Sequence, residues 1–182
     1  VLPCTTTPIT LGALTAEGKV SGQVAVAATP RLQRVWIEPD NAPATPEALR
    51  AIEDADLIVL GPGSLYTSLL PNLLVPGIAA ALAECRAAVV FVANLREQPG
   101  ETEGLRLSDH LSAIRAHVPE VRIDVVVAHQ GPPPSGSGAP LSAEAHQVHS
   151  FAGRIIATDL LDGADGHDPA KLADALLAVM GR

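Results

Sequence analysis

The sequence has 182 residues, of which 47% are hydrophobic and 2% aromatic, and its formal net charge is −8 at pH 7. This hydrophobic content is enough to bury a full core, which excludes a wholly disordered chain and predicts one domain. With 12 Lys and Arg against 20 Asp and Glu, the chain lacks the positive field that binds a phosphate backbone, so nucleic acid is not expected as a partner.

The first predicted unit is a small antiparallel appendage at residues 8–38. Residues 9–14 and 20–26 are apolar and flank a polar turn, which indicates a β-hairpin, and residues 34–38 alternate like a further strand. Trp36 in this last strand is expected to pack within the unit rather than to stack on a ligand.

From residue 45 onward the chain alternates between helix and strand patterns. Thr45 and Pro46 have the residue types of an N-cap and a first helical position, and Asp168 and Pro169 repeat that signal near the end. Helices are therefore expected at residues 46–55, 77–86, 108–118 and 169–180, and buried strands at residues 56–60, 88–93, 122–128 and 154–158. This order predicts a layered α/β fold with a mostly parallel sheet, in which the apolar strand at 56–60 is central.

Cys4 and Cys85 are isolated, which is typical of reduced thiols in a cytoplasmic protein, and Cys85 is expected in the core. No apolar run reaches the ~18 residues of a membrane span, and the N-terminus has no basic leader region. The chain does not begin with Met, so we expect it to be part of a longer protein. Residues 131–140 are rich in Pro, Gly and Ser and are expected to form a mobile, linker-like loop.

The loop at residues 61–68, directly after a predicted strand, is the first candidate ligand site. Its glycines let a ligand approach the backbone, and its hydroxyl groups and the following helix N-terminus suit a phosphate. Tyr66 stands where a dinucleotide fingerprint has its third Gly, Ser64 lies outside a G-x-S-x-G elbow, and the Lys of a P-loop is absent. A tight turn without a ligand is the alternative.

The next strand leads into residues 94–104, which combine amide, guanidinium and hydroxyl groups. Asn94 suits a base, ribose or sugar, and Arg96 suits a phosphate. The alternative is a solvated acidic loop. His146 and His149 have the spacing of half a zinc site, but no Cys or carboxylate is placed to complete it, so no metal site is predicted.

Two long motifs resemble the YvcK family, also called gluconeogenesis factors, which is related to the 2-phospho-L-lactate transferases (CofD-like proteins). They are ADLIVLGPGSLYTSLLPNLLVPGI at residues 55–78 and NLREQPGETEGLRLSDH at residues 94–110, and the opening VLPCTTTPITL and the closing HDPAKLADALL are similar to the same family. The resemblance implies a Rossmann-like three-layer α/β/α fold. Family members begin with a Gly-Gly-Gly-Thr-Gly loop and an Asp-rich segment that are absent here, so residues 1–182 are expected to be the C-terminal portion of a single domain.

The same resemblance implies a cytoplasmic regulatory factor that binds a UDP-sugar such as UDP-N-acetylglucosamine and acts in bacterial carbon-source adaptation, cell-wall synthesis and cell shape. A cell-wall synthesis protein and a second copy of the chain are candidate partners. The alternatives are a transferase of the 2-phospho-L-lactate type, for which residues upstream of Val1 would hold Mg²⁺, and a pure interaction protein controlled by residues 131–140. The family pattern departs at Ala128, His129 and Gly166, and no role is carried over to them.

No catalytic residue, resident cofactor or metal ligand is assigned. The predicted ligand-binding residues are Gly61, Gly63, Ser64, Tyr66, Thr67, Ser68, Asn94, Arg96, Gln98, Gly100, Glu101 and Thr102.

Overall fold

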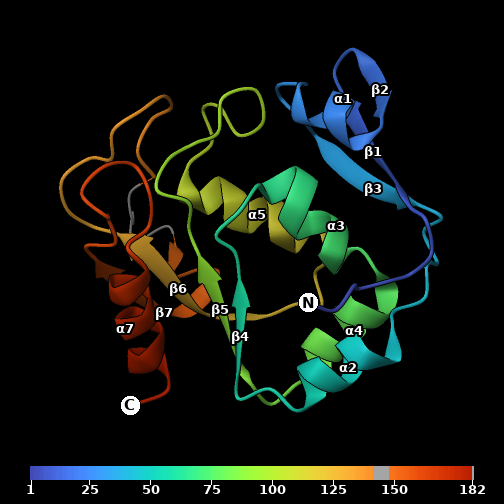
Figure 1. The fold of residues 1–182 in the computed structure, drawn as a ribbon. Coiled ribbons are helices and arrows are strands. Elements are labelled where there is room, and N and C mark those ends of the chain that lie inside the picture. Colours follow the sequence, from blue (N-terminus) through green and yellow to red (C-terminus); the bar gives the residue numbers. More distant parts are fainter. Residues whose placement is uncertain (142–147, 182) are drawn as a thin grey trace.

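The computed structural model describes residues 1–141 and 148–181, whose strands form two sheets (Figure 1). One sheet is antiparallel in the order β2-β1-β3, and the other is parallel in the order β4-β5-β6-β7. In chain order the elements are β1 (Thr10–Thr15), β2 (Gly18–Ser21), α1 (Gln23–Ala27), β3 (Arg34–Glu38), α2 (Pro46–Glu53), β4 (Leu57–Leu60), the π-helical turn η1 (Leu65–Leu69), α3 (Leu70–Leu73), α4 (Pro76–Glu84), β5 (Ala88–Val92), α5 (Leu107–His117), β6 (Ile123–His129), β7 (Ala152–Thr158) and α7 (Pro169–Val179). The predicted fold class, a parallel sheet with a small antiparallel unit, is confirmed.

The antiparallel sheet buries one of its faces. Leu11 and Ala13 of the middle strand β1 are buried together with Val35 and Ile37 of β3, which pair with β1. On the other face Trp36 lies across Gly12, where an added Cβ would come within 2.4 Å of the indole ring. Trp36 therefore packs within this sheet, as expected from the sequence.

The strand predicted at residues 20–26 is wrong beyond Ser21. Gly22 has φ +97°, a left-handed backbone conformation that turns the chain out of the β-ladder, and the short helix α1 follows. Val24 and Val26 alternate as in a strand, yet Val26 is fully buried while Val24 is exposed. These two valines lie on opposite sides of one helical turn, so their spacing does not indicate a strand.

Alternate side chains of the parallel sheet fill two cores. Val89 and Phe91 of β5 belong to the larger one, to which α4 and α5 contribute, whereas Val90 and Val92 belong to a second core closed by α7 through Ala175. Helices therefore lie on both faces of the sheet (Figure 1). The continuous apolar run of β5 follows from this arrangement, because a strand covered on both faces has no solvent side.

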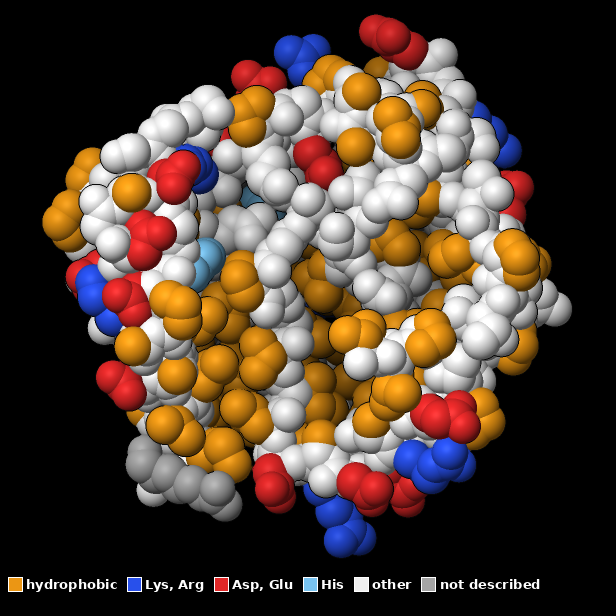
Figure 2. Space-filling model, viewed as in Figure 1, with side chains coloured by type: hydrophobic (Ala, Val, Ile, Leu, Met, Phe, Trp, Pro, Cys, Tyr) orange, Lys and Arg blue, Asp and Glu red, His pale blue; other side chains and the backbone are white. Residues whose placement is uncertain are grey.

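The strand β4 does not have the central position predicted for residues 56–60 within the described residues. In the part of the chain that the structure describes, β4 pairs only with β5 and forms an edge of the sheet, and Val59 is 38% exposed. Hydrophobic side chains gather on the sheet face between α7 and the α2–α4 pair (Figure 2). Hydrophobic content therefore predicted an apolar strand, but not its pairing within the described residues.

Both predicted helix N-caps are confirmed. The Thr45 hydroxyl accepts a hydrogen bond from the Ala48 N–H at 3.3 Å, and the Asp168 carboxylate accepts from Ala170 and Lys171 at 2.8 and 3.1 Å. The third predicted helix begins slightly earlier than expected, at Leu107.

Among the described residues, no single helix is long and apolar enough to cross a membrane. The segments Leu65–Leu73 and Pro76–Glu84 meet the length and composition criteria only as a pair bent by 75°.

Candidate functional site

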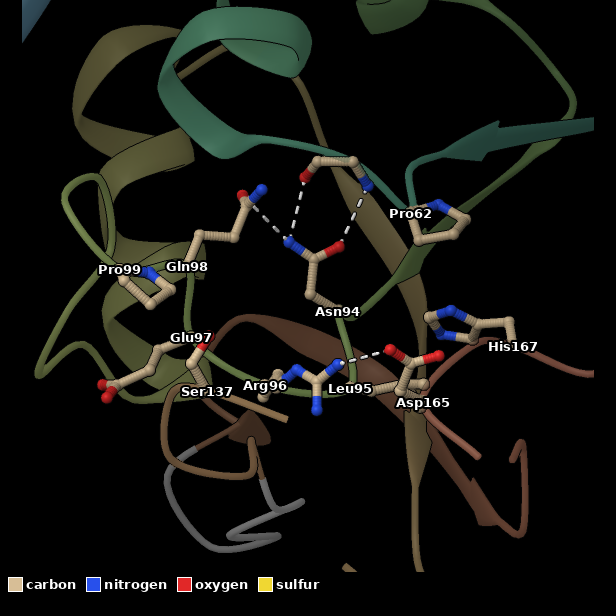
Figure 3. A pocket seen from close by; sticks show the side chains of 11 residues that line it. Pro62, Asn94, Leu95, Arg96, Glu97, Gln98, Pro99, Ser137, Asp165 and His167 are labelled. Atoms are coloured by element: carbon tan, nitrogen blue, oxygen red, sulfur yellow. Dashed lines mark hydrogen bonds and ion pairs between the residues drawn. The ribbon is translucent and has the colours of Figure 1, made fainter. Parts of the chain in front are cut away.

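The candidate site is a cavity of about 520 Å³ at the carboxyl ends of β4 and β5 (Figure 3). Its wall comes from residues 62–63, from residues 94–99, and from Ser137, Asp165 and His167. Two loops that the sequence predicts as ligand-binding therefore meet in one place, because parallel strands direct their carboxyl ends to the same edge of a sheet.

The loop after β4 lies close against β5. Gly61 has φ +86°, and a Cβ at this position would come within 2.8 Å of the Val92 carbonyl oxygen. Gly63 has open space within 4 Å of the position of a Cβ and lies at the wall of the cavity. Gly61 is thus required by the fold, while Gly63 has room for a side chain.

Asn94 fastens this loop to the end of β5. Its Oδ1 accepts from the Gly63 N–H at 3.0 Å, and its Nδ2 donates to the Gly63 carbonyl at 3.1 Å (Figure 3). Gln98 holds the next residue, since its Nε2 donates to the Ser64 Oγ at 3.0 Å. These side chains define the shape of the wall.

Glu101 binds the start of the π-helical turn η1, where the sequence predicts a phosphate. Its carboxylate is 6% exposed and accepts from the Tyr66 N–H at 2.8 Å, the Thr67 N–H at 3.3 Å and the Thr67 hydroxyl at 3.0 Å. A carboxylate here has the favourable charge for a helix N-terminus. A ligand phosphate at these N–H groups would have to displace Glu101, which sequence spacing alone did not indicate.

The other predicted residues lie behind or beside the cavity. Tyr66 is buried with its ring edge-on to His117, and its burial, followed by the charges of Glu101 and Asp109, raises the pKa of its phenol. Thr102 is fully buried and accepts from the Gln98 N–H at 2.8 Å.

Ser68 and Gly100 do not line the cavity. Ser68 instead borders a second, more apolar cavity of about 370 Å³ on the other side of the loop, beside β4.

Arg96 carries the positive charge of the wall. Its Nη2 lies 3.5 Å from the Asp165 carboxylate, and its Nη1 is buried without a hydrogen-bond partner among the described residues (Figure 3). Asp165 was not predicted from the sequence. It follows β7, so the strand-end argument applied to β4 and β5 would have found it if extended to the last strand of the sheet.

His167 also lines the cavity and was not predicted. Its Nε2 donates to the Ala93 carbonyl at 3.2 Å, and burial chiefly lowers the pKa of its imidazole. The ring is therefore neutral at pH 7 and keeps Nδ1 as an acceptor, which suits a ligand hydroxyl or amide.

The Pro/Gly/Ser segment at residues 131–140 closes one side of the cavity through Ser137. Its end is bonded to the second loop, since the Glu97 N–H donates to the Ala139 carbonyl and the Ala139 N–H donates to the Glu97 carboxylate, both at 2.9 Å. Backbone donors from Ala139 and Gly104 lower the pKa of Glu97. The predicted mobility of this segment stays a prediction, and the structure places it as a wall of the site.

Within the described ranges, no group of three or more His, Cys, Asp or Glu side chains is arranged to hold a metal ion. His146 lies outside these ranges, so the pair His146 and His149 is not described. His129 is the last residue of the Val-rich strand β6 and is buried. Its Nδ1 accepts from the Leu160 N–H and its Nε2 donates to the Pro132 carbonyl, so both ring nitrogens serve the fold.

Known proteins resemble both the sequence and the fold. Residues 1–160 match the protein family described as 2-phospho-L-lactate transferase CofD. A gluconeogenesis factor of Listeria innocua is 35% identical over 190 residues, which cover 99% of this chain and 59% of the relative. A Deinococcus radiodurans relative is 40% identical over 188 residues, which cover 97% of this chain and 40% of the relative. The chain thus spans about half the length of these relatives.

A crystal structure of a UPF0052 family member from Bacillus halodurans superposes with a TM-score of 0.88 at 33% identity, covering 97% of this chain and 61% of that one. The three comparisons agree on one family and one fold.

Proposed function

The chain belongs to the CofD family and within it to the YvcK-type gluconeogenesis factors, and from this premise we propose that its cavity binds a UDP-sugar of the UDP-N-acetylglucosamine kind. The observation that carries the proposal is the cavity itself. Its volume of about 520 Å³ is within the range of small-molecule sites, and its wall combines an exposed glycine, amides and one guanidinium. Such a wall suits a ligand with many hydroxyl and carbonyl groups and a localised anionic charge.

In this proposal the predicted residues divide into two groups. Residues of the cavity wall, which are Gly63, Asn94, Arg96 and Gln98, contact the ligand, and Ser64 is held at its edge by Gln98. Buried residues, which are Tyr66, Thr67, Glu101 and Thr102, hold the two loops in place. Gly61 fixes the approach of the first loop to β5.

The proposed biological role follows the gluconeogenesis-factor relatives. We propose a cytoplasmic regulatory factor in bacterial carbon-source adaptation, cell-wall synthesis and cell shape, with a cell-wall synthesis protein as its macromolecular partner. Regulation by ligand requires only that the occupied and empty states differ in affinity for that partner.

Calorimetric titration of the full-length protein with UDP-N-acetylglucosamine tests the binding. Gly63→Val is the informative variant, because a Cβ at Gly63 meets no atom within 4 Å in the protein and its φ is not left-handed, so the substitution adds bulk at the cavity wall without straining the fold. We expect saturable heat with the natural sequence and at least about tenfold weaker binding with Gly63→Val.

Gly153→Val on β7 is the matched control, since a Cβ there has only an ordinary contact of 3.6 Å with the Asp124 carbonyl. Equal affinity of the Gly63→Val and Gly153→Val proteins would remove this cavity from UDP-sugar binding.

A transferase of the 2-phospho-L-lactate type is the second candidate, and the match of residues 1–160 to CofD favours it. The full-length protein incubated with Mg²⁺, a nucleotide-activated 2-phospho-L-lactate and a hydroxyl-bearing deazaflavin acceptor distinguishes the two. Transfer of the phospholactyl group to the acceptor hydroxyl, with release of the nucleoside monophosphate, would replace the binding-only proposal, and intact reactants together with UDP-sugar binding would support it.

A further inference from the structure

Arg96 is the only Lys or Arg in the wall of the cavity as the structure describes it. The chain as a whole carries a formal charge of −8, so an anionic ligand gains nothing from the long-range field and depends on local cations. Two acidic residues, Glu97 and Asp165, share the wall. The Glu97 carboxylate is engaged by the N–H groups of Gly104 and Ala139, which leaves Asp165 as the carboxylate beside the guanidinium.

The guanidinium of Arg96 is held in place but incompletely bonded. Its side chain is 19% exposed, and its buried Nη1 has no hydrogen-bond partner among the described residues. The backbone at Gly136 lies directly against it, and a Cβ there would come within 2.5 Å of Nη1. A buried donor without an acceptor costs free energy, so the groups around Arg96 do not saturate its guanidinium, and Nη2 is the nitrogen that lies beside a carboxylate of the cavity wall.

Asp165 is a weak partner for this guanidinium. The distance of 3.5 Å from Nη2 to its Oδ2 is longer than the usual charge-assisted hydrogen bond, and its side chain is 66% exposed. It lies on a turn between Gly163 and Gly166, next to Asp162, whose Oδ1 accepts from the Gly166 N–H. Solvent competes for such a carboxylate, and the pair contributes little when exposed to this degree.

We propose that Arg96 is the anion subsite of the cavity, and that a phosphate or pyrophosphate group of the ligand takes the place of the Asp165 carboxylate on its guanidinium. The alternative position at the start of η1 is already filled by Glu101 with three hydrogen bonds. Asp165 then competes with the ligand's anionic group for Arg96 and lowers the affinity of the cavity for anions. The inference deepens the proposed function, because it locates the charged part of a UDP-sugar in the same cavity.

Titration of the full-length protein with inorganic pyrophosphate at low ionic strength tests the subsite. We expect Asp165→Asn to bind about threefold more tightly than the natural sequence, since it removes the competing charge and keeps the side-chain shape. Arg96→Met should weaken binding by at least about tenfold. The affinity of Arg96→Lys should lie between those of the natural sequence and Arg96→Met, because lysine keeps the charge but not the planar guanidinium.

Asp174→Asn on the exposed side of α7 is the control, because it changes the net charge equally without touching the cavity. Thermal unfolding of each variant checks that Arg96→Met remains folded, and Arg96→Lys carries the test if it does not. Equal gains with Asp165→Asn and Asp174→Asn would overturn the inference, as would unchanged affinity in both Arg96 variants.

The two proposals fail separately. Pyrophosphate binding that depends on Arg96 and Asp165, without any binding of UDP-N-acetylglucosamine, would refute the UDP-sugar and retain the anion subsite. Tight binding of UDP-N-acetylglucosamine that is unchanged in Arg96→Met and Arg96→Lys would retain the UDP-sugar and refute the anion subsite.

Discussion

At the scale of single residues, Glu101 explains why the loops around the cavity are ordered. It supplies three acceptor contacts to buried groups of Tyr66 and Thr67, which lie 35 and 34 positions away in the sequence. An internal carboxylate thus stabilises the turn that the sequence alone presents as a vacant phosphate cradle.

Replacement of Glu101 by Ala should destabilise the fold by about 3 kcal/mol, because it leaves two N–H groups and one hydroxyl buried without their partner. Glu101→Gln should cost less, since the amide oxygen still accepts from the backbone. Urea unfolding measures both, with the exposed Glu103→Ala expected within about 0.5 kcal/mol of the natural sequence. A cost for Glu101→Ala no larger than that for Glu103→Ala would show that the carboxylate does not hold the turn.

The sequence predicted the site unevenly at this scale. Asn94, Arg96 and Gly63 were assigned because strand ends of a parallel sheet converge, and that rule needs only local patterns. The pairing of Glu101 with Tyr66 and Thr67 depends on the path of a loop in three dimensions, which no local pattern encodes. The sequence therefore identified residues of types that suit a ligand. It did not distinguish the residues that hydrogen-bond to other residues of the protein from the residues that line the cavity.

At the scale of elements, His117 joins the antiparallel sheet to helix α5. Its Nε2 accepts from the Val35 N–H of β3 at 2.9 Å, and its Nδ1 donates to the Ala113 carbonyl at 2.7 Å. This arrangement requires a neutral ring, and burial, opposed by the Ala113 bond and helped by the charge of Arg34, lowers the pKa of His117.

The joint should weaken in acid. The folded-state pKa of His117 lies below its unfolded value near 6.5, so the unfolded chain binds the proton more readily. The contribution of His117 to the free energy of unfolding is therefore present above about pH 6.5 and is lost as the pH falls from there toward the folded-state pKa. The loss should be about 1 kcal/mol, the contribution of one hydrogen bond.

Urea unfolding at pH 7.5 and 5.5 measures this, with His117→Gln as the comparison, since its amide oxygen accepts from Val35 without titrating. The natural protein should lose more stability than His117→Gln between the two pH values, and the exposed His149→Gln should follow the natural protein. Identical pH dependence in the natural protein and His117→Gln would contradict the role of the joint.

Elements were more predictable than their arrangement. Caps and apolar periodicity located α2, α7 and the four parallel strands, because these signals are local. Within the described residues β4 lies at an edge rather than at the predicted centre, and hydrophobic content does not specify strand order. The helix α1 was missed because the turn at Gly22 converts an alternating stretch into helix.

At the scale of the whole molecule, the proposed site is formed by loops that follow β4, β5 and β7 and share one edge of the sheet. The cavity forms where they meet, and residues 131–140 form part of its border. Family membership, the fold and this geometry support the same kind of site, while the identity of the ligand is the central proposal.

Amide hydrogen exchange of the full-length protein, with and without UDP-N-acetylglucosamine, tests that proposal most directly. The account predicts slower exchange in residues 61–64, 94–98 and 165–167 when the ligand is present, and unchanged exchange in the antiparallel sheet. Saturating ligand without protection of these segments, or with protection confined to residues 10–38, would contradict it.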